Sequence, residues 1–354
     1  MMKIVVNDIA ATPTTGGTFT ILKNFYTDIC NNDKTNHWIF FLSGKYFKET
    51  KNVRIIVRPD LKKSKIKKAL FELVYGHYFI NRLNPDVYLS LQNIATCGIK
   101  AKHQIVYLHQ VIPFQHIKDF SFFKSEERTL AFYQKVVGWV IKYSLRRQKP
   151  YVIVQTASTK HDLVREKLID NSKILIHSPV VPGNMKNKIY HGSGRDFFYP
   201  ASSYIYKNHD IIFKAVDYLK LKGITNFHVN LTIPPKENLN DFISFFGHIP
   251  YERVMEMYSD NVLIFPSYIE SFGLPLIEAA SRADIILAAN TPFAHEILKS
   301  YTNVYYFNLN DYCKLAKLMN KVIKREIKSD GKNLIIPDNG SLFQFIINFL
   351  KVYY

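Results

Sequence analysis

The stretch FPSYIESFGLPLIEAA, residues 265–280, is the most informative part of this 354-residue sequence. It follows a short apolar run that predicts a buried strand, and from Leu274 its composition predicts a helix. In an open α/β sheet, such a junction borders the crevice in which ligands bind. Backbone N–H groups near Gly273 and Leu274 attract a diphosphate there, and Gly273 lets the backbone approach it closely. Glu270 and Glu278 flank this anion site, where they can accept hydrogen bonds from neighbouring hydroxyl groups.

Short apolar runs alternate with longer amphipathic ones on the N-terminal side of this stretch and continue beyond it. The alternation predicts βα units around parallel sheets, and its restart near Asp196 predicts two Rossmann-like sheets in an α/β protein. The expected strands lie at 3–6, 38–42, 87–89, 105–108, 197–199, 227–231, 244–247, 262–265 and 285–288, with helices at 18–29 and 209–222.

The proline- and glycine-containing segment 178–184 has the composition of a linker between the two series. We therefore predict a first domain at 1–178, a linker at 179–194 and a second domain at 195–338. Residues 339–354 are predicted to form a terminal helix that packs back on the body, because apolar residues after Ser341 recur at helical spacing.

The composition indicates a folded protein with anionic partners. Lys and Arg outnumber Asp and Glu by 47 to 29, which favours phosphorylated substrates, lipid head groups or nucleic acid. The three cysteines (Cys30, Cys97 and Cys313) are too far apart to suggest a disulfide framework or a zinc site, which fits a reducing compartment. No run approaches the roughly 20 apolar residues of a membrane span, so we expect a cytoplasmic protein, soluble or peripheral on a membrane.

Residues 265–280 resemble the signature of glycosyltransferase family four, Pro-Ser-x-x-Glu-x-Phe-Gly-Leu-Pro-x-x-Glu-Ala, with its Glu-x7-Glu pair. The resemblance implies a GT-B fold, in which two Rossmann-like domains face a cleft, and retaining transfer of a sugar from a nucleotide-sugar donor. It assigns Glu278 to the donor ribose and Glu270 to the transferred sugar near the reacting carbon. It also makes the first domain acceptor-side, the second donor-binding, and places Ser271, Phe272, Gly273 and Leu274 at the donor.

A second family signature spans FYPA, residues 198–201, through Lys207. Lys207 resembles the lysine that neutralises the donor diphosphate and stabilises the departing nucleotide, which suits a point-charge ammonium. Many members carry an arginine five residues earlier, where this chain has Ser202. Gly247 and Ile249 resemble the glycine turn that helps to hold the nucleotide base.

In the first domain, Gly16, Gly17 and Thr18 match the family's glycine-rich loop over the donor phosphates and the acceptor. A Gly-Gly pair by itself also fits an ordinary tight turn. His109 follows the expected strand 105–108 and resembles a histidine that contacts the transferred sugar, although a lone histidine is also common in a structural role. Three weaker candidates, Asn93, Gln155 and Thr156, follow other strands, and for the last two turn capping is the alternative.

No Asp-x-Asp and no His or Cys cluster with metal spacing occurs in the sequence. We therefore expect no metal and no cofactor, with the diphosphate neutralised by Lys207 and backbone amides.

Two basic segments stand out in the first domain. Cationic helices with apolar and aromatic residues suit an anionic membrane surface, although each segment also fits a solvated helix face. The first segment contains Lys62, Lys63, Lys65, Lys67 and Lys68, and the second contains Lys135, Lys142, Arg146, Arg147 and Lys149 around Trp139.

Together these features predict a hexosyltransferase of bacterial surface polysaccharide synthesis, such as O-antigen, lipopolysaccharide or capsule. Its acceptor would be a saccharide or a lipid-linked saccharide at the inner face of the cytoplasmic membrane. The alternatives are a GT-B nucleotide-sugar epimerase or phosphorylase, and a non-enzymatic basic nucleic-acid-binding protein, which a gel-shift salt titration would reveal. The donor sugar, the nucleotide base and the linkage are left open.

Overall fold

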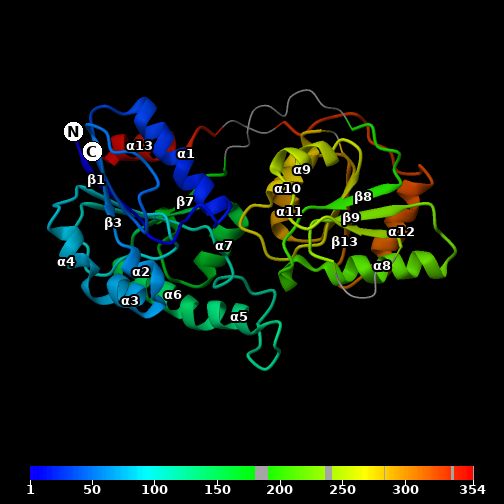
Figure 1. Ribbon diagram of the computed structural model, residues 1–354, viewed down its shortest axis with the longest axis horizontal. Coiled ribbons are helices and arrows are strands. Elements are labelled where there is room, and N and C mark those ends of the chain that lie inside the picture. Colours follow the sequence, from blue (N-terminus) through cyan, green and yellow to red (C-terminus); the bar gives the residue numbers. More distant parts are fainter. Residues whose placement is uncertain (180–189, 236–240, 283, 336–338, 354) are drawn as a thin grey trace. The chain divides into compact units, whose positions relative to one another are not determined.

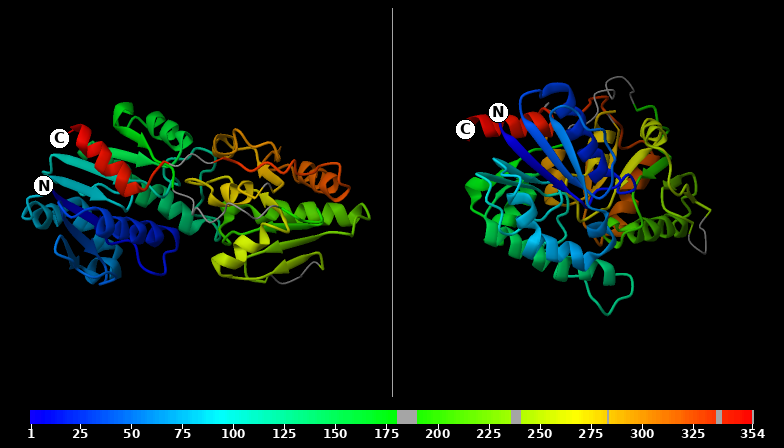
Figure 2. Two further views of the ribbon diagram at one scale, coloured as in Figure 1. Left: turned by 90° about the horizontal axis from the view of Figure 1, so that it is seen from above. Right: turned by 60° about the vertical axis from the view of Figure 1, so that its left-hand side comes forward.

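The computed structural model describes residues 1–179, 190–235, 241–282, 284–335 and 339–353 (Figures 1 and 2). These residues form two compact units, the first made of 1–179 with 339–353 and the second of 190–335. The linker predicted at 179–194 lies mostly outside the described residues.

The first unit is built on a parallel sheet in the order β3-β2-β1-β4-β5-β6-β7. The order reverses between β1 and β4, so side chains that follow these two strands lie at the point where open α/β sheets bind ligands. The strands are β1 (Lys3–Asp8), β2 (His37–Leu42), β3 (Val53–Val57), β4 (Val87–Ser90), β5 (His103–Tyr107), β6 (Tyr151–Val154) and β7 (Ile174–Ile176).

Helices cover both faces of this sheet, which explains why β1, β2 and β4 are apolar on both sides. The helical elements are α1 (Gly17–Asn32), α2 (Pro59–Lys63), α3 (Lys65–Leu70), the π-helical η1 (Phe71–Tyr75), α4 (Gly76–Asn81), α5 (Arg128–Ala131), the π-helical η2 (Phe132–Val137), α6 (Gly138–Gln148), α7 (Ala157–Arg165), η3 (Asn171–Lys173) and α13 (Leu342–Tyr353).

The terminal helix α13 packs back on the first unit beside α1, as predicted (Figure 1). Its apolar side chains Phe343, Ile346 and Leu350 are buried in one cluster with Leu22 and Phe25 of α1.

The second unit has a parallel sheet in the order β10-β9-β8-β11-β12-β13, which reverses between β8 and β11. Its elements are β8 (Asp196–Tyr199), η5 (Ile205–Lys207), α8 (His209–Leu221), β9 (His228–Leu231), β10 (Ile243–Phe245), α9 (Tyr251–Met257), β11 (Val262–Phe265), α10 (Leu274–Ala280), β12 (Ile286–Ala289), α11 (Pro292–Ile297), β13 (Val304–Phe307) and α12 (Tyr312–Ile323). The α/β class and the two Rossmann-like sheets are therefore confirmed.

None of the helices among the described residues is long and apolar enough to cross a bilayer.

Candidate functional site

Lys207 and Glu270 meet at the reversal point of the second sheet. Lys207 ends the turn η5 after β8, and Glu270 lies in the loop after the neighbouring strand β11. The Lys207 Nζ is 2.5 Å from the Glu270 Oε1, and the two side chains are 17% and 14% exposed. The sequence-predicted phosphate cation and sugar carboxylate therefore form one ion pair that solvent can still reach.

Hydrogen bonds hold the two loops that carry this ion pair against each other. The Ser267 Oγ and the Tyr268 N–H both donate to the carbonyl of Tyr206, at 3.3 and 3.1 Å. The Tyr199 hydroxyl, at the end of β8, donates to the Lys207 carbonyl at 3.1 Å. These contacts fix the backbone of both loops, from which the two charged side chains extend.

Glu278 lies on α10 and is buried, with a relative exposure of 6%. The Tyr251 hydroxyl donates to its Oε1 at 3.1 Å, and the Tyr258 hydroxyl donates to its Oε2 at 3.0 Å. Burial raises the pKa of the Glu278 carboxyl, and the two tyrosine hydrogen bonds oppose that rise. Tyr258 is fully buried whereas Tyr251 is 46% exposed, so Oε1 is the oxygen nearer to solvent.

Gly273 precedes α10 with a φ of 88°, a left-handed conformation that favours glycine. Of the neighbouring residues predicted at the donor, Leu274 is exposed, Ser271 is half-buried and the Phe272 side chain is buried.

Gly247 follows β10 with a φ of 64°, and its N–H donates to the Ile233 carbonyl at 3.2 Å. Ile249 packs against the core of the second unit. Tyr251 begins α9 two residues later, and its bond to Glu278 ties this turn to the buried carboxylate.

In the first unit, the loop after β1 contains Gly16, with a φ of 60°, at the start of α1. Gly16 and Gly17 are exposed, and the Thr18 hydroxyl donates to the Thr15 carbonyl at 3.2 Å. Asn93, with a φ of 68°, follows β4 on the other side of the reversal point. The predicted glycine loop thus follows one strand of the reversal and Asn93 follows the other.

His109 is fixed by two contacts from this region. The Asn93 Oδ1 accepts from its backbone N–H at 2.5 Å, and its Nε2 lies 2.6 Å from the Leu91 carbonyl. Burial lowers the pKa of the ring to about 4, so the imidazole is neutral and its Nε2–H donates to that carbonyl. The buried Nδ1, without a partner among the described residues, is left as an acceptor for a hydroxyl.

The geometry bears out turn capping for Thr156, whereas the Gln155 side chain contacts a neighbouring strand. Thr156 caps α7, where its hydroxyl accepts from the Thr159 N–H at 3.2 Å, and Gln155 donates to the Tyr107 hydroxyl at 3.0 Å.

Residues 235–334 match the family model for glycosyl transferases group 1. The matched segment contains Glu270, Glu278 and the turns at Gly247 and Gly273. It supports the expectation that the chain is a glycosyltransferase. Lys207 lies outside the matched residues.

A curated relative agrees with this match. The chain is 22% identical to the O-antigen chain mannosyltransferase RfbU of Salmonella typhimurium over 219 residues, which are 59% of this chain and 58% of that protein. The alignment thus spans less than two thirds of the relative.

Two solved structures share the fold. The lipopolysaccharide outer core galactosyltransferase WaaB has a TM-score of 0.63 at 14% identity, covering 100% of this chain and 99% of that one. HepE of Anabaena, solved in complex with UDP-glucose, has a TM-score of 0.63 at 13% identity, covering 99% and 100%.

The neutral state of His109 gives a prediction for folding stability. The pKa of His109 is about 4 in the folded protein and 6.5 in the unfolded chain. Its contribution to the free energy of unfolding is therefore complete above pH 6.5 and is lost as the pH falls to 4. The loss is up to about 3 kcal/mol, because only the unfolded histidine takes up a proton in that window. We expect His109→Gln to show a smaller decrease in unfolding free energy between pH 7.5 and 4.5 than the wild type, as measured by urea denaturation. An identical pH dependence of both proteins would contradict a depressed pKa.

Asp8, at the end of β1, was not among the predicted site residues. It is 1% exposed, its Oδ1 accepts from the Ala11 N–H at 3.2 Å, and its Oδ2 has no hydrogen-bond partner among the described residues. Burial raises its pKa to about 7, opposed by the Ala11 bond and by the charges of Lys68 and Lys62. The sequence signal was a polar Asn-Asp pair that ends an apolar strand before a glycine loop.

A buried polar network supports this end of β1. The Glu72 carboxylate, in the π-helical η1, accepts from Asn7, Gln92 and Thr96. Burial raises the pKa of Glu72, and Lys68 opposes that rise.

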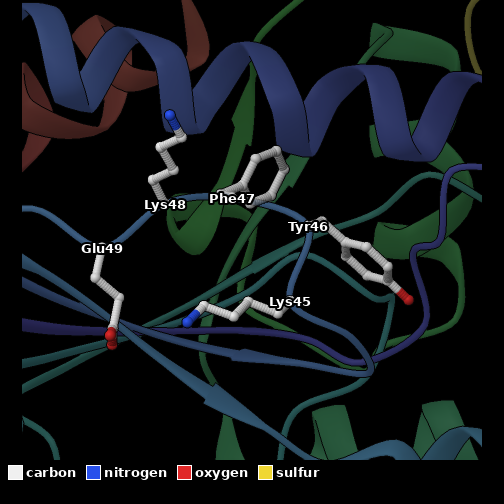
Figure 3. A pocket seen from close by; sticks show the side chains of 5 residues that line it. All are labelled: Lys45, Tyr46, Phe47, Lys48 and Glu49. Atoms are coloured by element: carbon white, nitrogen blue, oxygen red, sulfur yellow. The ribbon is translucent and has the colours of Figure 1, made fainter.

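The segment that follows β2 forms a pocket (Figure 3). The pocket is lined by Lys45, Tyr46, Phe47, Lys48 and Glu49. The Phe47 ring stacks on Tyr26 of α1 at 4.4 Å, and the Tyr46 hydroxyl pairs with the Ser43 Oγ at 3.0 Å. The pocket lies at the carboxyl end of a parallel strand, the same edge of the sheet as the glycine loop, with ammonium and carboxylate groups at its rim.

Proposed function

We propose that this chain is a retaining glycosyltransferase of family four that transfers a sugar from a nucleotide-sugar donor to a saccharide or lipid-linked saccharide. The observation that carries the proposal is the Lys207–Glu270 ion pair at the reversal point of the second sheet. An anion-binding cation and a hydroxyl-binding carboxylate at that point suit the diphosphate and the sugar of one donor.

Donor binding exchanges the partners of this ion pair. The diphosphate takes over the Lys207 ammonium, and the freed Glu270 carboxylate accepts hydrogen bonds from hydroxyls of the transferred sugar. In the reaction, the bond between the anomeric carbon and the diphosphate oxygen breaks, and a bond to the acceptor oxygen forms as that hydroxyl passes its proton to the departing diphosphate. Lys207 stabilises the negative charge that develops on the leaving diphosphate.

Glu278 is assigned to the ribose of the donor. Its Oε1 bonds to the half-exposed Tyr251, a partner that ribose hydroxyls can replace, whereas the buried Tyr258 keeps Oε2 oriented. The family resemblance assigns Gly16, Gly17 and Thr18 to the donor phosphates and the acceptor, and the neutral His109 to a sugar hydroxyl.

The acceptor class and the pathway rest on the named relatives. One acts on the O-antigen chain and another on the lipopolysaccharide outer core, which supports a saccharide acceptor in bacterial surface polysaccharide synthesis. A lipid-linked acceptor would place the chain at the inner face of the cytoplasmic membrane, in line with its net charge of +18.

The test is a panel of UDP-, GDP- and dTDP-sugars offered to the purified chain. We expect saturable binding of one nucleotide class and slow donor hydrolysis that Glu270→Gln reduces, with the exposed Glu326→Gln as the matched control. Absence of binding to every nucleotide sugar, with a correctly folded protein, would contradict the proposal.

Activity is also expected to be independent of divalent metal ions, because Lys207 and backbone amides neutralise the diphosphate. Donor hydrolysis in excess EDTA should match the untreated rate. Complete loss in EDTA that magnesium or manganese restores would contradict this prediction.

A further inference from the structure

Exposed apolar side chains form a stripe along α3, η1 and α4 of the first unit. Ile66, Leu70, Val74 and Tyr78 recur every four residues, and their exposures are 75%, 47%, 56% and 62%. Helical residues four apart lie on one face, so these side chains line one side of this helical segment. Most apolar side chains of this unit are buried, and a continuous exposed stripe therefore indicates a binding surface.

A second stripe runs along η2 and α6. Phe132, Val136, Trp139 and Tyr143 have exposures of 41%, 45%, 63% and 38%, and the rings of Trp139 and Tyr143 stack at 5.7 Å. The two stripes are neighbours, because the Lys65 Nζ of α3 lies 5.7 Å from the centre of the Phe132 ring.

The connection between β5 and α5 adds a tip to this face, since it loops out beyond the helices in Figure 1. Phe123 is 96% exposed, the largest value among the exposed apolar side chains of the described residues, and Phe122 is 43% exposed. The Lys135 Nζ lies 5.8 Å from the Phe122 ring, which joins the tip to the second stripe.

Cations surround the apolar stripes. The exposed ones are Lys63, Lys65, Lys67, Lys124, Lys135, Arg146 and Arg147. Of the acids within these segments, Glu72 and Glu127 are buried, whereas Asp119 and Glu126 are exposed, and Asp119 pairs with Lys135 at 3.2 Å. Cations therefore outnumber the exposed acids on this face. Two lysines of the predicted basic run do not belong to this surface. The Lys62 ammonium donates to the Ala10 carbonyl at 2.5 Å. Burial lowers the pKa of the half-buried Lys68, and the charges of Glu72 and Asp8 oppose that shift.

We infer that this face, made of the two stripes and the Phe122–Phe123 tip, inserts shallowly into an anionic bilayer. This inference rests on the proposed function, in which the chain acts on a lipid-linked acceptor. Trp, Tyr and Phe side chains enter the interfacial region, while the surrounding ammonium and guanidinium groups contact lipid phosphates. A second copy of the chain fits less well, because a twofold contact would place the same cations against one another.

The chain contains a convenient reporter of insertion. It has two tryptophans, of which Trp38 is buried at 1% exposure and Trp139 lies on this face at 63%. A change in tryptophan emission on adding vesicles therefore reports mainly on Trp139.

The experiment mixes the full chain with vesicles of phosphatidylethanolamine and phosphatidylglycerol, or of phosphatidylcholine alone. We expect a blue shift of the emission and co-sedimentation with anionic vesicles only. Phe122→Ser with Phe123→Ser should weaken binding at least tenfold, and Lys63, Lys65 and Lys67 changed to Gln should weaken it at low salt with less effect at high salt. The matched controls are Leu221→Ser and Lys317→Gln, exposed residues of the second unit.

Equal binding of the wild type and the Phe122/Phe123 variant, or no emission shift with anionic vesicles, would overturn the inference. A lipid-free dimer that the same variant dissociates would also overturn it, in favour of a second copy. Donor hydrolysis is measured on the same proteins without lipid. A chain that hydrolyses donor but ignores vesicles refutes only this inference, and one that binds vesicles but no nucleotide sugar refutes only the proposed function.

Discussion

Lys207→Ala is expected to slow sugar transfer roughly 30- to 1000-fold, because removal of one preorganised charge donor costs on the order of 2–4 kcal/mol of transition-state stabilisation. The ammonium acts where negative charge builds up on the leaving diphosphate, so the loss should appear in kcat more than in donor affinity. Single-turnover donor hydrolysis with saturating nucleotide sugar measures it directly.

The control for this variant is Lys317→Ala, which removes an exposed ammonium from α12 of the same unit. Because Lys207→Ala also leaves Glu270 without its partner, Lys207→Ala with Glu270→Gln separates the two effects. A folded Lys207→Ala variant with the wild-type rate would show that the ion pair has no part in catalysis.

Glu278→Ala is expected to weaken binding of the nucleoside diphosphate roughly 10- to 100-fold, because hydrogen bonds to a charged group contribute about 1.5–3 kcal/mol. The substitution also leaves the buried Tyr258 hydroxyl without its acceptor. Titration calorimetry with the nucleoside diphosphate alone isolates this effect from contacts to the sugar.

Two further variants serve as controls for this measurement. Tyr251→Phe removes the hydroxyl that occupies Oε1, so it should bind the nucleotide as well as or better than the wild type. Glu326→Ala removes an exposed carboxylate of the same unit and should have no effect. Normal nucleotide affinity of Glu278→Ala would contradict the assignment to the ribose.

Local patterns predicted the fold well. The strand Val262–Phe265 lies where its apolar run predicts it, and α8 ends within one residue of its predicted end. The Lys207–Glu270 contact required the order of the strands, because it joins residues that follow β8 and β11 and are far apart in the sequence. The spacing of residues within a single segment does not show which strands are neighbours in the sheet.

Long-range burial explains what the sequence left out. Asp8 and Glu72 are ordinary acids in the sequence, and only the packing of η1 against β1 makes them buried groups with raised pKa values. The contact of Lys62 with the Ala10 carbonyl was hidden for the same reason. The apolar stripe from Ile66 to Tyr78 was not predicted either, because helical spacing does not tell whether an apolar face packs on the core or, as here, stays exposed.

The Lys207–Glu270 ion pair also bears on which molecules the proposed site can retain. Inorganic phosphate or a free nucleotide can replace Glu270 at the ammonium, but it leaves the carboxylate, only 14% exposed, without a counter-ion. An intact donor satisfies both charges, since it brings hydroxyls as well as an anion. Once the sugar has left, the remaining nucleotide again satisfies only one of them, and the re-forming ion pair helps to expel it. The same two side chains would then reject incomplete ligands and limit product inhibition.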